Sequence, residues 1–308
     1  MTRFILNNGV NIIKNSGDFV GLPEGRRAAI IKGSWENGFA DILIREKVDL
    51  LYLNYSLGWE GEDLSFLGEL PNLRCIKIIA GKVRGLRNIE NLTDLQYLSI
   101  SATCREEMDF TKLHSLQYCF LEWWMGAASI LDCADLDYLY LNSLKGIELN
   151  RLESLKKVRT LTIGNSTIDN LSWIKSLPSL EKLELINCPR IKDFDSLASS
   201  KRLTWLALNG CKGLLTIDFV VELERLEIFV FSDCGEISTI APLASVRSLK
   251  AVSFSGSTVI KDGDLSPLLS LPKLAMLSFT RRRHYSHKLI KRWNWENFDK
   301  PDIQLCER

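Results

Sequence analysis

The sequence lacks an excess of either charge. Its 39 lysine and arginine residues almost balance its 38 aspartate and glutamate residues, which leaves a formal net charge of +1. Proteins that bind nucleic acid or anionic membranes through their overall charge carry a clear basic excess. The composition therefore gives no reason to expect either of them as the main partner.

Long apolar runs are missing as well. No stretch approaches the roughly 18 apolar residues that a membrane-spanning helix needs. The N-terminal segment contains Arg3 and a short apolar patch, but Asn7, Asn8 and Asn11 interrupt it and no small-residue cleavage site follows. We therefore expect no signal peptide, no membrane segment and a cytoplasmic protein.

Residue patterns typical of catalysis are scarce. The chain has three histidines, and only His284 and His287 are close in sequence. Their spacing lacks the glutamate and the helical context of a metalloprotease motif. Neither a phosphate-binding loop ending in lysine nor a nucleophile elbow with a central serine is present. The sequence therefore predicts a non-enzymatic protein without cofactor or metal.

What the sequence has instead is one short apolar phrase that recurs eleven times, at intervals of 20 to 25 residues. Clear copies are LEKLELINC from Leu180 and LTWLALNGC from Leu203. A period of this length indicates stacked units, each of which needs neighbours to bury its apolar face. The copies begin at Val48, Leu73, Leu95, Leu116, Leu136, Val158, Leu180, Leu203, Leu226, Leu249 and Leu274.

The repeat that begins at Val158 illustrates how one unit should fold. Leu161 and Ile163 alternate around Thr162, as in a short strand with one buried face. Apolar residues then follow at three-residue intervals, which predicts a 3-10 or short helical return over the same core. They are Ile168, Leu171, Ile174 and Leu177.

These L-x-x-L-x-L phrases resemble the leucine-rich repeat family, specifically its 22-residue, phosphatase-regulator-like and internalin-like subclass. The resemblance covers residues 48–280. It implies an α/β fold: a right-handed solenoid of about eleven repeats, with a parallel sheet on the concave side and 3-10 or short helical segments on the convex side. The repeat from Leu116 departs from the pattern, with Cys119 at a leucine position and Trp124 at the turn.

The two ends differ from the repeats, as caps that protect the core of a solenoid must. Residues 1–47 predict a small hairpin followed by an amphipathic helix around Trp35 to Glu46. In residues 281–308 we expect a short helix and an extended tail, with Trp293, Trp295 and Phe298 covering the last repeat. The predicted division is an N-terminal cap (1–47), a solenoid (48–280) and a C-terminal cap (281–308).

Three cysteines, Cys188, Cys211 and Cys234, recur every 23 residues at the position where the chain leaves the strand. Stacking would place their thiols in a column, where they could bind a metal or form a disulfide. Small polar side chains at such a turn can also bond to exposed backbone groups, so we predict reduced, structural cysteines. In other repeats the position is filled by Ser56, Thr103, Ser166 and Ser257.

The resemblance also indicates which side chains point outward from the concave strands. Tyr97, Tyr118 and Tyr138 fall in one column of successive repeats. Tyrosine and tryptophan are enriched at binding hot spots, although an aromatic ladder can also simply stabilise a sheet. The predicted partner-binding residues are Tyr52, Tyr97, Tyr118, Phe120, Glu122, Trp123, Tyr138, Tyr140, Lys182, Glu184 and Trp205.

We therefore predict a module that binds a protein partner on its concave face; family analogy suggests an inhibitor or immunity protein that acts by occupancy. The pattern specifies neither the partner nor an oligomeric state. One alternative is a glycan or small-ligand receptor that stacks its ligand on Tyr97, Tyr118, Tyr138 and Trp205. Another is nucleic-acid contact through a C-terminal basic segment. That segment contains Arg281, Arg282, Arg283, Lys288, Lys291 and Arg292.

Overall fold

Each of the eleven apolar phrases forms a strand that begins two residues after the phrase does. The computed structural model describes residues 4–7, 9–13, 23–289 and 305–307. Contacts between residues divide the chain into two units, residues 1–141 and 142–308. No helix in the described part of the chain is long and apolar enough to cross a membrane.

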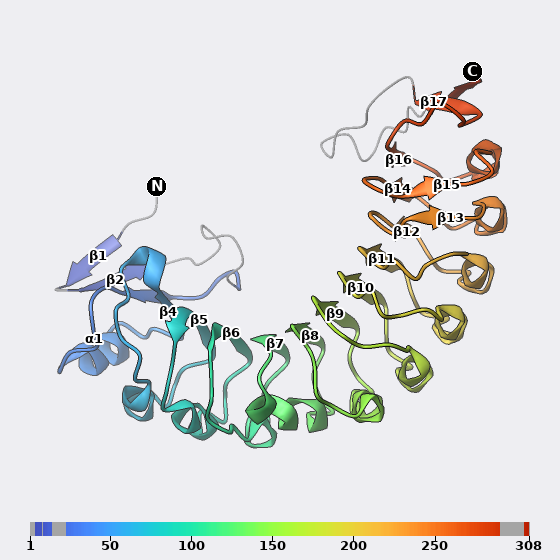
Figure 1. Cartoon of the computed structure of the whole chain (residues 1–308). Helices are drawn as coiled ribbons and strands as arrows, with labels where there is room; N and C mark the ends of the chain where they lie inside the picture. Colours follow the sequence, from blue (N-terminus) through green and yellow to red (C-terminus); the bar gives the residue numbers. More distant parts are fainter. Residues whose placement is uncertain (1–3, 8, 14–22, 290–304, 308) are drawn as a thin grey trace. The chain divides into compact units, whose positions relative to one another are not determined.

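The first unit begins with an antiparallel hairpin and continues as a parallel sheet (Figure 1). Its strands are β1 (Phe4–Asn7), β2 (Val10–Ile13), β3 (Ala28–Ile31), β4 (Leu50–Asn54), β5 (Cys75–Lys82), β6 (Tyr97–Thr103), β7 (Tyr118–Glu122) and β8 (Tyr138–Asn142), whose last residue opens the second unit. Its helices are α1 (Phe39–Arg45) and the 3-10 segments η2 (Tyr55–Leu57), η3 (Ser65–Glu69), η4 (Leu86–Asn91), η5 (Phe110–Lys112) and η6 (Met125–Asp132).

The second unit continues the alternation of parallel strand and 3-10 turn. Its strands are β9 (Thr160–Gly164), β10 (Lys182–Ile186), β11 (Trp205–Asn209), β12 (Ile228–Val230), β14 (Ala251–Phe254) and β16 (Met276–Phe279), with the small pairs β13 (Glu236–Ile237) with β15 (Val259–Ile260) and β17 (His287–Leu289) with β18 (Leu305–Glu307). Its 3-10 segments are η7 (Leu149–Ser154), η8 (Ser172–Ser176), η9 (Asp195–Ser199), η10 (Asp218–Glu222), η11 (Ala241–Ser245) and η12 (Ser266–Ser270).

Within each unit the repeat strands form one layer and the 3-10 segments the other, with the core between them (Figure 1). Leu161 and Ile163 of β9 are fully buried, and so are the corresponding leucines of β10 and β11. The parallel strands and the 3-10 returns are thus confirmed, and the leucine-rich repeat solenoid is the fold of this chain. Below, the term open face denotes the face of each sheet that points away from the 3-10 segments.

Helix α1 is shorter than the sequence predicts, because it begins at Phe39 rather than near Trp35. Gly38, the residue before it, has a φ of 91°, a left-handed conformation that ends the preceding turn. The ring of Trp35 instead stacks on Phe66, with ring centres 3.9 Å apart. The predicted cap residues Trp293, Trp295 and Phe298 lie outside the described residues, and the three-part division of the chain stays a prediction.

The predicted cysteine column exists in the second unit and consists of free, buried thiols. Each thiol donates to a carbonyl of the preceding repeat. The donor-to-acceptor distances are 3.6 Å from Cys188 to Ile163, 3.7 Å from Cys211 to Leu185 and 3.0 Å from Cys234 to Leu208. Burial raises the pKa of all three thiols. The column is therefore a hydrogen-bonding element of the turns.

Three members of the predicted column are wrong, because Ser56, Thr103 and Ser257 are exposed, whereas Ser166 is buried and its hydroxyl donates to the Leu144 carbonyl at 2.7 Å. After Cys234 the bond is made by Thr258, whose hydroxyl donates to the Phe231 carbonyl at 3.0 Å. The expected residue, Ser257, is exposed and accepts a hydrogen bond from the Lys212 ammonium at 2.8 Å. The repeat that begins at Leu249 is two residues longer than the one before it, and its buried hydroxyl comes from the residue after the expected one.

A second column lies beside the thiols. Asn165 and Asn187 have φ values of 48° and 53°, in the left-handed region that asparagine tolerates better than most residues. The side-chain amide of Asn187 donates to the side-chain carbonyl of Asn165, and that of Asn165 donates to Asn142, each at 2.8 Å. Every turn in this part of the second unit is therefore bonded to the turn before it.

Candidate binding surface

Four aromatic rings lie together on the open face of the first unit. They form the aromatic cluster, which consists of Tyr97 from β6, Phe120 from β7, and Tyr138 and Tyr140 from β8. Phe120 is its centre: its ring centre lies 4.6 Å from that of Tyr138, in a stacked arrangement, 5.2 Å from Tyr97 and 6.3 Å from Tyr140. The alternation of side chains along a strand places all four rings on one side of the sheet.

Tyr118, which the sequence predicts in the middle of this column, does not join the cluster. The strand register pairs Tyr97 with Tyr118, yet the ring that lies between Tyr97 and Tyr138 belongs to Phe120. The Tyr118 side chain is 39% exposed, and none of the ring contacts among the described residues involves it. Tyr118 is thus an accessible aromatic residue at the edge of the cluster.

Two hydroxyl groups of the cluster, those of Tyr97 and Tyr140, have a raised pKa. Burial raises the pKa of Tyr97 to about 12. Burial also raises the pKa of Tyr140, and the nearby negative charge of Glu122 adds to this shift. The cluster therefore offers half-buried ring surface together with neutral hydroxyl groups, which can both donate and accept hydrogen bonds.

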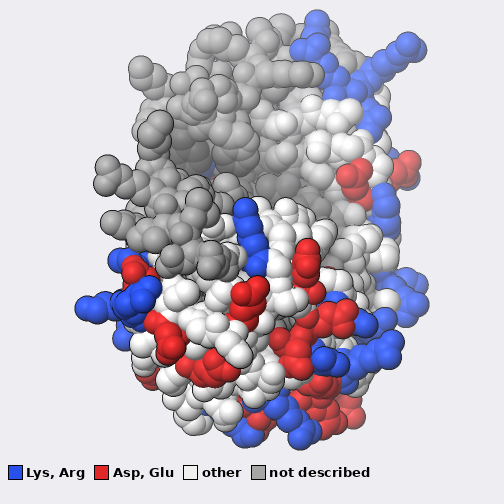
Figure 2. All heavy atoms as spheres, turned by 90° about the vertical axis from the view of Figure 1, so that its left-hand side faces the viewer, with Lys and Arg blue, Asp and Glu red and all other residues white. Residues whose placement is uncertain are grey.

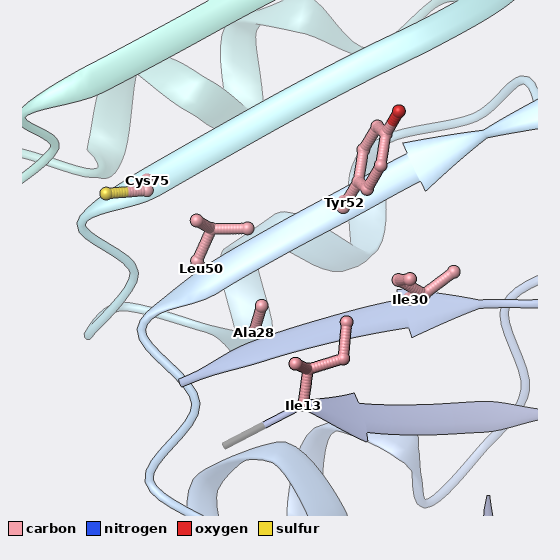
Figure 3. Packing of buried hydrophobic residues seen from close by; sticks show 6 residues of the cluster. All are labelled: Ile13, Ala28, Ile30, Leu50, Tyr52 and Cys75. Atoms are coloured by element: carbon pink, nitrogen blue, oxygen red, sulfur yellow. The ribbon is translucent and has the colours of Figure 1, made fainter. Parts of the chain in front are cut away.

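Tyr52, another predicted contact residue, is only 8% exposed. It belongs to a buried apolar patch on β2 to β5, whose side chains Figure 3 shows on neighbouring strands. Its hydroxyl group also lies 2.6 Å from the side-chain nitrogen of Asn54, which donates to it. Tyr52 is therefore a packing residue. The patch contains Ile13, Ala28, Ile30, Leu50, Tyr52 and Cys75.

A signal for this burial is present in the sequence. Residues 28–31, which form β3, are apolar at every position, and strands that are buried on both faces read as continuous apolar runs rather than alternating ones. All four residues of β3 are indeed buried. The outward positions of the neighbouring strand β4 are consequently covered, in contrast to those of β6, β7 and β8.

Two further predicted residues lie next to the cluster. Glu122 follows Phe120 on the same side of β7 and is half-buried. Trp123, directly after the strand, is 6% exposed and offers almost no surface to a partner. The accessible part of the predicted site in the first unit thus consists of the aromatic cluster, Tyr118 and Glu122.

The remaining predicted contact residues belong to the second unit. The ammonium group of Lys182 lies 4.2 Å from the ring centre of Trp205, a cation–π contact between β10 and β11. The Thr162 hydroxyl is 3.5 Å from the carboxylate of Glu184. These side chains occupy the open face of the second unit, where Trp205 also borders a hollow that the sequence did not predict.

The C-terminal basic segment is less open to a ligand than its sequence indicates. Tyr285 is buried, and its hydroxyl accepts a hydrogen bond from the Ile260 amide at 3.0 Å. The guanidinium of Arg282 donates to the Gly256 carbonyl at 2.7 Å. Two of the predicted basic residues, Lys291 and Arg292, lie outside the described part of the chain.

Charges of both signs are interspersed over the described residues in Figure 2. Several charged side chains of the first unit are paired: the Arg26 guanidinium lies 3.0 Å from the Asp49 carboxylate, and the Lys112 ammonium lies 2.6 Å from the Glu90 carboxylate. An interspersed surface of this kind produces no broad field of one sign that would attract a polyanion. It is compatible with recognition by shape and by apolar contact.

Comparison with known proteins supports the leucine-rich repeat family. No protein-family model matches the chain. A stretch of 143 residues is 27% identical to leucine-rich repeat-containing protein 56 of Homo sapiens and covers 45% of this chain and 26% of that protein. Another of 138 residues is 29% identical to disease resistance protein RPS4B of Arabidopsis thaliana and covers 43% of this chain and 11% of that protein. The chain thus matches only a minor part of either relative.

The solved structures show the same fold. An internalin of Listeria monocytogenes, InlF, is similar with a TM-score of 0.53 and 17% sequence identity, over 83% of this chain and 87% of that one. A likeness at this level of identity concerns the fold alone. The assignment to the 22-residue subclass stays a prediction.

Proposed function

We propose that this protein is a non-enzymatic binding module that holds a protein partner on the open face of its first unit. The observation that carries the proposal is the aromatic cluster around Phe120, in which four half-buried rings meet at a sheet surface. Leucine-rich repeat proteins typically mediate contacts between proteins, which agrees with this use of the fold.

The physical argument rests on pre-organisation. A Tyr or Phe side chain has two rotatable χ angles, so it contributes a large contact area for a small loss of conformational entropy. The rings already contact one another, and a sheet fixed by neighbouring repeats holds them in place. A partner would therefore meet a surface that needs little ordering on binding, which favours affinity. Tyr118 and Glu122 supply exposed and polar contacts beside the rings.

The finer part of the proposal concerns the consequence of binding. We infer that the protein acts by occupancy, as an inhibitor or immunity protein that covers the working surface of its partner. The cytoplasm is the proposed compartment, because the seven cysteines whose side chains are described are free, as is usual under reducing conditions.

An affinity capture from native lysate tests the proposal, with the wild-type chain, the double variant Phe120→Ala/Tyr140→Ala and the control Met125→Ala as baits. Met125 is an exposed apolar residue on η6, away from the open face. We expect one protein to be recovered by the wild type and the control but not by the double variant. That protein, produced recombinantly, should bind the double variant about 30-fold or more weakly than the wild type, the loss typical of a hot spot.

Unchanged affinity of the recombinant protein for a folded double variant contradicts the proposal. Binding of a glycan, rather than a protein, to the wild type and its loss in the same double variant would replace the protein partner by the receptor alternative. Steep loss of binding between low and moderate salt, unaffected by the double variant, would instead favour the basic segment.

A further inference from the structure

A hollow of about 490 Å³ lies at the edge of the first unit where the strands β4, β5 and β6 end. Its lining comes from η2, from the segment that follows η2, and from the last residues of β5 and β6. Volumes between about 300 and 1,000 Å³ are characteristic of ligand sites. The lining residues on which the argument depends are Tyr55, Trp59, Glu60, Glu62, Gly81 and Lys82.

The segment that brings two carboxylates to the hollow is fixed by its backbone. Trp59, at the start of this segment, pairs with Gly33 as an isolated bridge. The Glu60 amide donates to the Gly33 carbonyl at 3.0 Å, and the Glu62 carbonyl accepts from the Arg84 amide at 2.9 Å. The two glutamates therefore start from a backbone that needs little ordering when a ligand binds.

A β-bulge forms the opposite side of the hollow. Ile79 pairs with Ser101 and Lys82 with Thr103, so three steps along β5 face only two steps along β6. Bulges bend a strand and are over-represented next to functional sites. Gly81 lies within this bulge, and a Cβ atom added to it would meet nothing within 4 Å. The missing side chain thus leaves space at this end of β5.

The hollow has hydrogen-bonding groups of both kinds. Trp59 is only 3% exposed, and its indole nitrogen has no acceptor among the described residues. Because buried N–H groups are almost always paired in proteins, a ligand oxygen in the hollow would supply the acceptor. The Glu60 carboxylate is exposed and takes part in none of the ion pairs or side-chain hydrogen bonds of the described residues. It is therefore available to a ligand that donates.

The remaining charges at the hollow form an exposed pair. The Lys82 ammonium lies 3.2 Å from the Glu62 carboxylate, and both side chains are about half or more exposed. Surface pairs of this kind contribute little to stability, and a carboxylate can accept several hydrogen bonds. Both groups can therefore also bond to a ligand without losing each other.

Tyr55 contributes an apolar surface beside these polar groups. Its side chain is 62% exposed, and none of the ring contacts among the described residues involves it. It directly follows β4, and its carbonyl accepts a hydrogen bond from the Gly58 amide at 3.1 Å, which fixes the backbone that carries the ring. A ligand in the hollow thus finds an aromatic face next to donors and acceptors.

We propose that this hollow binds a neutral sugar ring. Each hydroxyl group of a sugar both donates and accepts, so hydroxyls can donate to Glu60 and Glu62 and accept from Lys82 and the Trp59 indole. The C–H face of the ring packs against Tyr55. A cationic ligand would leave the indole without an acceptor, and an anionic ligand would meet the unpaired charge of Glu60. The inference goes beyond the proposed function, because the hollow shares no residue with the aromatic cluster.

A glycan array probed with the full chain tests the inference, followed by calorimetry with methyl glycosides of the sugars that bind. We expect neutral sugars to be selected, with an affinity that changes little between low and moderate salt. Tyr55→Ala removes the aromatic face and Gly81→Phe fills the hollow, so each should weaken binding about tenfold or more. Stronger binding of a methyl glycoside than of the free reducing sugar would identify the ligand as part of a larger glycan.

A matched control is available in η3. Gly68→Phe adds the same side chain at a glycine whose Cβ would also meet nothing within 4 Å, and it should bind sugar like the wild type. The inference is overturned if no neutral sugar binds, if only amino or acidic sugars bind, or if folded Gly81→Phe binds normally.

The double variant Phe120→Ala/Tyr140→Ala separates the inference from the proposed function. It should leave sugar affinity unchanged, whereas Tyr55→Ala should leave the capture of a protein partner unchanged. Loss of sugar binding in the double variant but not in Gly81→Phe would place the sugar on the aromatic cluster and overturn the inference. Each proposal can therefore fail without the other.

Discussion

Each unit contains a stack of aromatic rings centred on phenylalanine, and the two stacks lie on opposite faces of the same kind of sheet. In the first unit the stack around Phe120 lies on the open face. In the second unit Phe231, Phe254 and Phe279 also stack in a row, with ring centres 5.3 and 5.2 Å apart, but the first two are fully buried and belong to the core. The same residue type is thus half-exposed on the open face in one unit and packed in the core in the other.

The difference follows from the parity of a position within its strand. Phe120 pairs with Ser99, an outward residue, whereas Phe254 pairs with Phe279 at a position where other repeats carry a core leucine. Because side chains alternate across a strand, a shift of one residue moves a ring from the core to the surface. Aromatic content therefore says little about binding until the face is known.

The largest expected effect compares one ring from each stack. Phe231→Ala leaves a cavity in the core and should lower the free energy of unfolding by about 3–5 kcal/mol. Phe120→Ala removes only cross-strand contacts on a half-buried surface and should cost about 1 kcal/mol or less. Urea unfolding of both variants measures the difference. Equal losses would show that the stack around Phe120 is a structural element of the first unit.

A smaller expected effect concerns the pH dependence of the free energy of unfolding, which cysteines of both units should influence in the same direction. Burial raises the pKa of Cys75 in the first unit and of Cys234 in the second to about 11. The unfolded thiols ionise at lower pH, so their contribution to stability is complete below about pH 8.5 and is lost as pH rises towards 11. Each thiol should reduce the free energy of unfolding by at most about 1.4 kcal/mol per pH unit in this range.

Urea unfolding at a series of pH values measures this loss. In Cys75→Val the decline above about pH 8.5 should be shallower, because one titrating group has been removed. An unchanged slope in this variant would mean that Cys75 ionises as readily in the folded chain as in the unfolded one. The matched variant Cys234→Thr should have a similarly reduced slope.

Cysteines in the two units should respond differently to the loss of the thiol donor. Cys211→Val leaves the Leu185 carbonyl without its bond and should cost about 1–2 kcal/mol, whereas Cys211→Ser keeps a donor and should cost less. Cys119, in the first unit, occupies a core leucine position, so Cys119→Val should change stability by less than about 1 kcal/mol. Thermal unfolding gives the ranking, and a Cys211→Val no worse than Cys211→Ser would remove the hydrogen-bonding role.

An effect of similar size to that of Cys211→Val separates backbone strain from side-chain bonding in the asparagine column. Asn187→Ala removes the amide bond to Asn165 and places alanine at a φ of 53°, so we expect a loss of about 1–2 kcal/mol. Asn187→Gly removes the same bond without the backbone strain and should cost less. Chemical denaturation measures both, and equal losses would assign the whole effect to the hydrogen bond.

Most of the fold could be predicted from the sequence. The position of each strand followed from its apolar phrase, because the inward leucines alternate with outward residues in every copy. The turn between Phe254 and Val259 could not be predicted in detail, since the choice of Thr258 over Ser257 depends on how a longer repeat closes. Helix α1 also began later than its amphipathic pattern indicates, because Gly38 adopts a left-handed conformation.

Less of the candidate binding surface could be predicted. The sequence identified the column of outward positions but not which rings contact one another. The ring between those of Tyr97 and Tyr138 belongs to Phe120 rather than to Tyr118, because ring contacts depend on side-chain rotamers. Tyr52 was expected to be accessible, yet apolar residues of β2 and β3 extend the same face and bury it. The hollow beside Trp205 arises from small residues that neighbour one another only across strands, so no local pattern indicates it.

The columns of turn bonds in the second unit have a mechanical consequence. The cysteines and asparagines in them bond within their own repeat and to the repeat beside it. Resistance to a pulling force is therefore shared between successive pairs of repeats rather than concentrated at one point. Under tension this unit should lose repeats one after another from an end, in steps of about one repeat each. Repeats further from that end would keep their strand pairing while an outer repeat is already detached.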